Sequence, residues 1–158
     1  MANENKKDFN KKMNDSKDMP KIVELNEEAA IKWKGKTMII APPKDYDEFM
    51  KKVPEGKLIT TDTLRKAMAK KYKTDITCPL TCGIFVNICA WASYQRNEDK
   101  TPYWRTLKSD GELNVKYPEG IELQKELLEK EGHEIISKGK KNIKYYVKDF
   151  EKSLIELK

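Results

Sequence analysis

Apolar positions along the chain follow two periods, and together they predict a mixed fold of helices and short strands. Short apolar runs that end at prolines or turns predict strands, whereas apolar residues three and four positions apart predict helices. The expected extended segments are residues 21–26, 37–41, 103–107, 134–136 and 143–147. The expected helices are residues 27–33, 45–53, 63–71, 80–95, 118–131 and 149–157. The pattern therefore indicates an α+β fold that is mainly α.

Two of these helices outline a known motif. Thr60, Thr61 and Asp62 offer N-cap side chains to the helix 63–71, and a short polar turn leads from it to the helix 80–95. The second helix is apolar almost all round, which is typical of a central helix. Two helices joined by a short turn, followed by a basic hairpin, predict a winged helix-turn-helix domain.

The chain of 158 residues suits one domain with tails. Residues 1–20 contain almost no apolar side chains, so we expect a disordered polar tail there. The expected domain spans residues 21–136, and residues 137–158 are expected to add a basic hairpin and a short helix.

The net charge of +6 is unevenly distributed. Segment 57–75 holds six basic and two acidic residues, and segment 137–158 holds seven basic and three acidic residues. Segment 108–136 is acidic, with four basic and eight acidic residues. A local basic surface suits the phosphates of a nucleic acid. The alternative is that these lysines are solvated side chains on helix faces, and in a lysine-rich chain the charge alone favours this alternative.

Several protein classes are excluded or disfavoured. No stretch approaches the ~18 consecutive apolar residues that a membrane-spanning helix needs. The first twenty residues are polar and lysine-rich, so no signal peptide is expected. Three cysteines without a secretory signal do not indicate a disulfide scaffold. We therefore expect a reducing, cytoplasmic location.

The cysteines Cys78, Cys82 and Cys89 fall on one face of the predicted helix. Zinc sites use four ligands at paired short spacings, and His133 is the single histidine, so no metal is expected. Cys78 and Cys82, near the helix N-terminus, are candidates for partly exposed, reactive thiols, whereas Cys89 is expected in the core. The chain has no phosphate-binding glycine loop and no nucleophile elbow. We therefore expect no cofactor and no catalysis of the kinds that these motifs support.

Two adjacent aromatic residues, Tyr103 and Trp104, precede Arg105. Aromatic rings beside a cation can stack on a nucleobase. The alternative, in which one ring is core and the other is surface, fits the residues equally well.

Four stretches resemble the O6-alkylguanine-DNA alkyltransferase family, over about residues 45–133. They are Val53-Pro54-x-Gly56-Lys57-x-x-Thr60, Thr101-Pro102-Tyr103-Trp104-Arg105-Thr106-Leu107, Ser109-Asp110-Gly111 and Gly120-x-x-x-Gln124-x-x-Leu127-Leu128-x-x-Glu131-Gly132-His133. The last stretch is the most specific. The resemblance implies a winged helix-turn-helix whose second helix enters the DNA minor groove, with a guanine flipped out so that a cysteine takes its alkyl group.

The chain departs from that family at the reacting positions. Tyr103 stands where the resemblance places the acceptor cysteine, and Trp104 stands where it places the neighbouring histidine. A phenol of pKa ~10 is a poor nucleophile near neutral pH. Thr61 replaces a tyrosine that presses on a phosphate, and Cys82 or Gly83 replaces the arginine that enters the base stack.

Loss of the acceptor cysteine resembles the alkyltransferase-like branch, which binds alkylated DNA without repairing it. We therefore expect a non-enzymatic, monomeric protein that binds double-stranded DNA, recognises O6-alkylguanine or other damaged bases, and has DNA-repair proteins as further partners. Its expected base pocket is Tyr103, Trp104, Arg105 and Glu131. Its expected DNA contacts are Lys57, Thr61, Arg65, Lys66, Lys70, Lys71, Cys82, Gly83, Lys138, Lys140 and Lys141.

Two alternatives remain open on the sequence. One is an interaction protein that keeps the fold without recognising lesions. The other is a residual alkyltransferase that uses a different thiol, such as Cys82.

Overall fold

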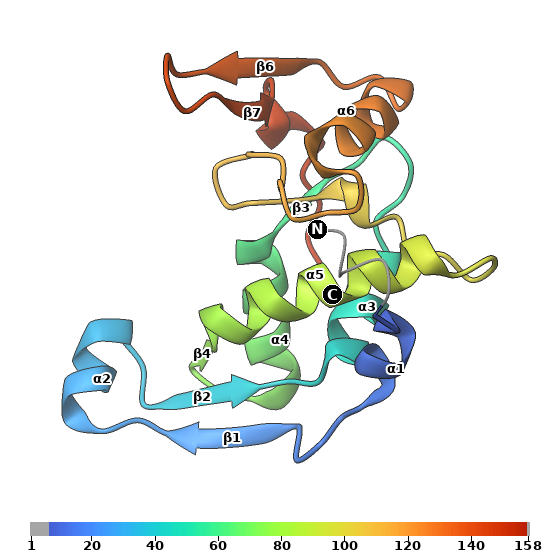
Figure 1. The fold of residues 1–158 in the computed structure, drawn as a ribbon. Helices are drawn as coiled ribbons and strands as arrows, with labels where there is room; N and C mark the ends of the chain where they lie inside the picture. The colour runs from blue at the N-terminus through green and yellow to red at the C-terminus, as the bar shows by residue number, and fades with distance from the viewer. Residues whose placement is uncertain (1–6, 158) are drawn as a thin grey trace.

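The computed structural model describes residues 7–157 (Figure 1). Its helices are α1 (Phe9–Asn14), α2 (Glu27–Trp33), α3 (Pro43–Lys51), α4 (Thr61–Tyr72), α5 (Pro79–Gln95), α6 (Gly120–Lys130) and the 3-10 helices η2 (Tyr103–Arg105) and η3 (Phe150–Ser153). Its strands are β1 (Lys21–Glu24), β2 (Thr37–Ile40), β3 (Ile59–Thr60), β4 (Ile76–Thr77), β5 (Thr106–Leu107), β6 (Ile135–Lys138) and β7 (Lys144–Val147). The predicted α+β fold, mainly α, is confirmed.

Within residues 7–157 the strands form three small sheets. In the first, β2 pairs antiparallel with β1 and parallel with β4. In the second, β3 pairs parallel with β5, which places the start of α4 beside the segment that follows η2. The third is the antiparallel hairpin of β6 and β7.

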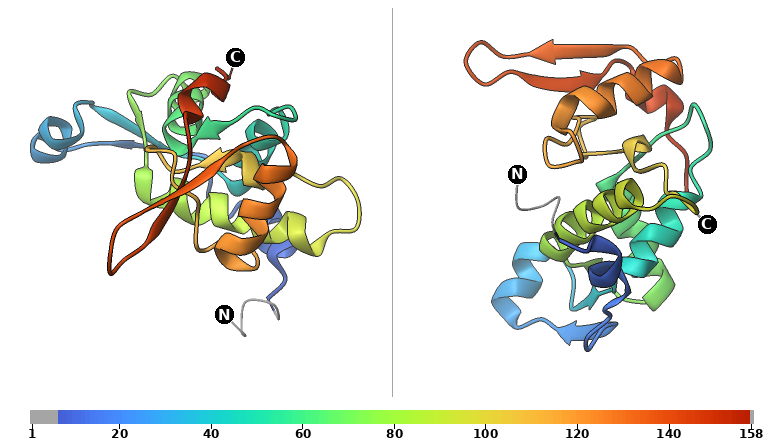
Figure 2. Two further views of the ribbon diagram at one scale, coloured as in Figure 1. Left: turned by 90° about the horizontal axis from the view of Figure 1, so that it is seen from above. Right: turned by 45° about the vertical axis from the view of Figure 1, so that its right-hand side comes forward.

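The core is built around α5, which is as central as its apolar composition predicts. Cys82, Val86 and Cys89 are buried on this helix, and α1, α3 and α4 pack around it (Figure 2). A second buried cluster lies between α6 and the hairpin and includes Leu113 and Val147. The chain thus has a main core around α5 and a smaller one among α6, the hairpin and the segments that carry Leu58, Leu107 and Leu113.

The expected disordered tail at residues 1–20 is wrong where the structure describes it. Residues 9–14 form α1, whose Phe9 and Met13 are buried. The Phe9 ring stacks on Trp91 of α5 at 5.5 Å between centroids, and the Phe9 backbone N–H donates to Gln95 Oε1 at 3.0 Å. Two apolar residues one turn apart are enough to hold this short helix in place, because they pack against apolar residues of α5. Residues 1–6 lie outside the described part of the chain.

The two-helix unit follows the sequence closely. Thr60 caps α4, since its side chain accepts from the Thr63 N–H at 3.3 Å. Lys73 ends α4 in the left-handed conformation with φ of 56°. Pro79 then begins α5, where the missing proline N–H costs nothing because first-turn N–H groups have no helical acceptor.

The C-terminal segment differs from its predicted boundaries. The hairpin begins at Ile135, so residue 137 lies inside β6 rather than at the start of an extension. Val147 is buried in the second cluster, and Leu154 forms an isolated parallel β-bridge with Leu58. The expected helix over residues 149–157 is only the single 3-10 turn η3, and the expected extended run 103–107 is η2 followed by the two-residue strand β5.

Two parts of the chain project on the same side of the molecule. The β6–β7 turn and the arm formed by β1, α2 and β2 both reach out to the left in Figure 1, and the first turns of α5 lie between them. Helix α2 contains no buried residue. None of the helices described in residues 7–157 is long and apolar enough to cross a membrane.

Candidate nucleic-acid interface

The residues that resemble an active site form a hydrogen-bonded cluster. Arg105 of η2 donates from Nε and Nη2 to the carboxylate of Glu131 at the end of α6, at 2.8–3.1 Å. Trp104 Nε1 donates to the same carboxylate at 2.9 Å, and the Gly56 N–H does so at 3.2 Å. Arg105 Nη1 also donates to the Val53 carbonyl at 2.7 Å. The cluster therefore ties η2 and α6 to the turn before β3.

The ionisation of Glu131 suits an anchor. Burial by itself raises the pKa of this carboxyl, but the hydrogen bonds from Arg105, Trp104 and Gly56 outweigh burial and hold the pKa below its usual value. All the polar partners of the carboxylate are donors, so it stays charged. We conclude that the cluster of Trp104, Arg105 and Glu131 joins segments of the fold and is not set up for proton transfer.

Tyr103 is part of the core. Its side chain is 3% exposed and meets Tyr117 edge-on at 5.2 Å and Trp104 edge-on at 5.5 Å. Burial raises the pKa of its phenol far above the ordinary value, so the group stays neutral and non-nucleophilic. The four residues expected to line a base pocket thus pack against one another.

An open groove lies instead beside the first half of α5. Its walls are the start of α4, the exposed face of α5 and the loop of residues 108–116, and its volume is about 370 Å³. Leu80, Ile84 and Val115 line it and are 72%, 48% and 53% exposed. A side chain at Gly83 would meet no atom within 4 Å. The helix therefore presents an unobstructed surface here.

The polar side chains of the groove are mostly donors. Arg65, Lys108 and Lys116 supply three cations along its rim. Arg65 pairs with Asp62, and Lys108 lies 3.7 Å from Glu112. Asn87 and Asn114 lie between the cations, and Asn114 Nδ2 donates to Asn87 Oδ1 at 2.9 Å.

One buried side chain holds the groove's loop in place. Gln124 of α6 is fully buried, and its Oε1 accepts from the Asn114 N–H at 2.8 Å. Its Nε2 donates to the Trp104 carbonyl at 3.2 Å. The loop is thus fastened to the same helix that anchors Arg105, and the groove is preformed.

Two of the expected DNA contacts lie in this groove besides Arg65. Thr61 lines it, with its Oγ1 at 3.4 Å from Ser109 Oγ, and Gly83 lines it from α5. Cys82, by contrast, is buried in the core, and burial raises the pKa of its thiol to about 11. The expectation of a partly exposed thiol at Cys78 or Cys82 is wrong, because all three cysteines are buried.

The other expected basic contacts are spread around the molecule. Lys66 lines a neighbouring cavity, whereas Lys70 and Lys71 line a cavity between α3 and α4, where Lys71 pairs with Asp45 at 3.3 Å. The remaining lysines are exposed on the turn before β3 and on the hairpin: Lys57, Lys138, Lys140 and Lys141. A basic stretch in sequence therefore becomes several surfaces, because a helix turns by 100° per residue.

The sequence interpretation missed the polar residues contributed by α5 and the loop. Lys108 and Lys116 lie in a segment whose net charge is negative, and that average concealed them. In the structure Lys116 is exposed at the groove, and the acidic residues Glu122, Glu126 and Glu129 line a different surface, on α6. Asn87 is half-buried in an otherwise apolar stretch of α5, and its polar side chain there is the one sign of the groove that the sequence offers.

The comparisons with known proteins are sparse. No family model and no curated protein matches the chain. The chain is similar to a solved structure of S. pombe Atl1 in complex with damaged DNA containing O6-carboxymethylguanine, with 18% identity and a TM-score of 0.48. The match covers 73% of this chain and 94% of that one. A similarity this low supports no inference about what this chain binds.

Proposed function

We propose that the chain is a non-enzymatic, alkyltransferase-like protein that binds double-stranded DNA, damaged DNA included, through the groove beside α5. The observation that carries the proposal is the combination of three cations on the rim with exposed apolar side chains on the helix between them. The groove is lined by the cations Arg65, Lys108 and Lys116 together with the apolar residues Leu80 and Ile84. Cations at a rim suit phosphates, and apolar side chains on a helix suit a widened minor groove with unstacked bases.

The groove also has the features that an extruded base requires. Its volume of about 370 Å³ is of the size of small-ligand pockets. Asn87 and Asn114 supply amide groups, which hydrogen-bond to base edges in protein–DNA complexes. A damaged base leaves the stack more readily than an intact one, because less pairing energy is lost. We therefore expect tighter binding to a duplex with a lesion than to the intact duplex.

The proposal is non-enzymatic because all three cysteines, the residues whose thiols could accept an alkyl group, are buried. Tyr103 is buried and neutral, and burial raises the thiol pKa of both Cys82 and Cys89. Alkyl transfer needs a thiolate in contact with the alkyl carbon. Mass spectrometry after incubation with O6-methylguanine DNA is expected to show the unmodified protein, and a methyl adduct would contradict this part of the proposal.

Fluorescence anisotropy with two duplexes tests the binding. The duplexes are identical except for one O6-methylguanine, and each is titrated at low and at moderate salt. We expect binding to both at low salt and a preference for the lesion that persists at moderate salt. Equal and steeply salt-dependent binding would leave DNA binding standing and remove base recognition. Absence of binding to either duplex would overturn the proposal and direct attention to a protein partner.

A further inference from the structure

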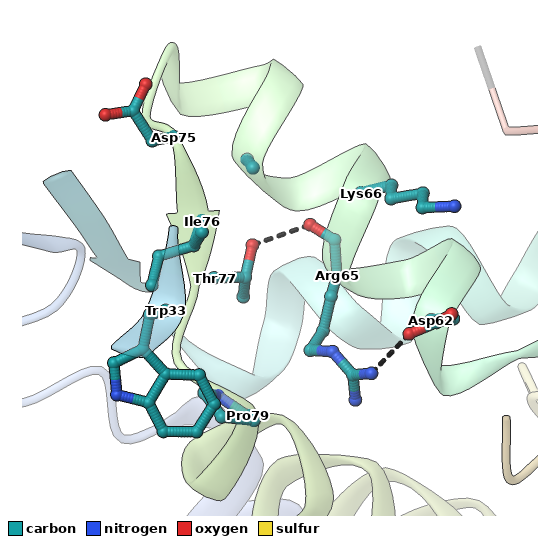
Figure 3. A pocket seen from close by; sticks show the side chains of 9 residues that line it. Trp33, Asp62, Arg65, Lys66, Asp75, Ile76, Thr77 and Pro79 are labelled. Carbon is teal, nitrogen blue, oxygen red and sulfur yellow. Dashed lines mark hydrogen bonds and ion pairs between the residues drawn. The ribbon is translucent and has the colours of Figure 1, made fainter. Parts of the chain in front are cut away.

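A second cavity lies next to the groove, between the arm of β1, α2 and β2 and helix α4 (Figure 3). Its volume is about 280 Å³. The lining residues that matter here are Trp33, Asp62, Arg65, Lys66 and Pro79. Figure 3 shows the Trp33 indole beside Pro79, with the Arg65 guanidinium across the cavity.

Trp33 belongs to neither buried cluster, and the ammonium of Lys32 lies 5.2 Å from the centre of its ring. Trp33 ends α2, which has no buried residue, and the side chain is 43% exposed. The other two tryptophans do have packing roles, because Trp91 is 4% exposed and Trp104 is bound to Glu131. An exposed indole at the wall of a cavity is a surface on which a flat ring can stack.

The opposite wall carries charge in a fixed position. Arg65 pairs with Asp62 one turn earlier, and its carbonyl accepts from the Thr77 hydroxyl at 2.6 Å. Lys66 is exposed beside them. Asp75 turns away from the cavity, as Figure 3 shows, and its carboxylate accepts from the Lys36 N–H at 2.8 Å. Figure 3 shows the Lys66 side chain extending away from Trp33, so the cavity offers an aromatic plane and, facing it, the Arg65 guanidinium with its Asp62 partner.

The groove and the two cavities are neighbours, because they share lining residues. Arg65 and Pro79 line both the α5 groove and the Trp33 cavity. Asp75 lines both the Trp33 cavity and a further cavity of about 500 Å³ on the arm, where Lys34 and Lys36 lie. A chain of phosphates leaving the groove would pass cations along this whole path.

We propose that the Trp33 cavity binds an unpaired nucleobase, stacked on the indole, with its phosphate near Arg65 and the lysines of the arm. The inference rests on the proposed function, because the strand that supplies the base would continue from the α5 groove. The same chemistry also fits a free nucleotide, and the experiment separates these two sources.

The test compares a blunt duplex with the same duplex carrying a short single-stranded overhang. Stacking of a base on an aromatic side chain is worth about 1–3 kcal/mol, which is about 5- to 150-fold in affinity. Trp33→Ala is expected to weaken binding of the overhang DNA by that factor and to change binding of the blunt duplex less than about twofold. Trp33→Phe is expected to restore most of the loss. The matched control is Ile22→Ala, since Ile22 is 55% exposed on β1 and outside these cavities.

Quenching of the indole fluorescence identifies the source of the base. Quenching by a deoxynucleoside monophosphate that disappears in Trp33→Ala would assign a free nucleotide to the cavity, whereas quenching by single-stranded DNA alone would assign a strand. Either result supports the nucleobase. The proposal is overturned if Trp33→Ala has no effect with any ligand, or if it weakens both duplexes equally.

A variant in the groove shows which of the two proposals has failed. Lys116 lines the groove and not the Trp33 cavity. If Lys116→Gln leaves binding of the blunt duplex unchanged, the groove proposal fails whatever Trp33 does. If Lys116→Gln weakens the blunt duplex and Trp33→Ala has no effect on overhang DNA, only the inference about Trp33 fails.

Discussion

Two neighbouring regions of this protein differ in what their polar residues do. In the cluster of Trp104, Arg105 and Glu131, the polar atoms bind one another and the side chains of Arg105 and Glu131 are only 13% and 7% exposed. In the groove beside α5, Leu80 and Lys116 are exposed without a packing role. Residues that resemble an active site can therefore persist because they hold the fold together, while a different surface is available to a ligand.

The largest expected effect is on stability and comes from the cluster. Glu131→Ala leaves the Arg105 guanidinium largely buried without its partner, and we expect a loss of about 3–5 kcal/mol in the free energy of unfolding. Urea denaturation followed by circular dichroism measures it. Lys130→Gln, at the neighbouring exposed position, is expected to change stability by less than about 0.5 kcal/mol. A similarly small loss for Glu131→Ala would show that the cluster is not structural.

The next effect is on DNA binding and comes from the groove. Lys108→Gln combined with Lys116→Gln removes two phosphate contacts, and we expect duplex affinity to fall about tenfold or more at low salt. The slope of log affinity against log salt is expected to fall by about 0.9 for each lysine. Anisotropy across a salt series measures both quantities, with Lys130→Gln as the control. An unchanged slope would mean that these lysines do not contact phosphates.

The pH dependence of stability sharpens the account of the cluster. The pKa of Glu131 is lower in the folded protein than its usual value of 4.5, so its contribution is present above that pH and is lost as the pH falls below it. Wild-type protein is therefore expected to lose stability below about pH 4.5 more steeply than Glu131→Gln, which lacks the titrating group. Parallel pH profiles from thermal melts would contradict the assigned role.

A smaller effect is expected from the apolar residues of the groove. Leu80→Ala removes a side chain that is 72% exposed, so unfolding free energy is expected to change by less than about 0.5 kcal/mol. Affinity for the lesion duplex is expected to fall severalfold, because the proposed function places this leucine against unstacked bases. Ile143→Ala, 53% exposed before β7, is the matched control. Equal behaviour of the two variants would remove Leu80 from the interface.

The smallest effect is expected at the position that the resemblance assigns to the acceptor. Tyr103→Phe keeps the buried ring and removes only the hydroxyl, so DNA affinity is expected to stay within about twofold. A marked and selective loss of binding to the lesion duplex would show that Tyr103 faces the base after all.

The sequence predicts most of the elements because their signals are local. The Thr60 cap, the apolar face of α5 and the hairpin all depend on residues close together in the chain, and the structure contains each of them. The prediction failed for α1, because what orders it is the distant Trp91. The sequence pattern around α1 gives no information about a packing partner that lies 82 residues away in the chain.

The site was less predictable than the fold for the same reason. Arg65, Thr61 and Gly83 were expected at the interface and do line one groove. The groove's other wall comes from the loop of residues 108–116, which is held by hydrogen bonds to distant residues: Gln124 accepts from the Asn114 N–H, and Trp91 of α5 donates to the Lys116 carbonyl. The lysines of this loop lie in a segment whose net charge is negative, so the charge of the segment did not reveal them. The basic stretch on α4 is divided among several faces of that helix.

Chemical-shift mapping of backbone amides during titration with a short DNA duplex locates the DNA-binding surface. We expect the amides of Leu80 to Asn87 and of the loop of residues 108–116 to shift first, while those of Trp104, Arg105 and Glu131 shift little. Shifts concentrated at Trp104, Arg105 and Glu131, or no shifts at low salt, would overturn the proposal that DNA binds in the groove beside α5.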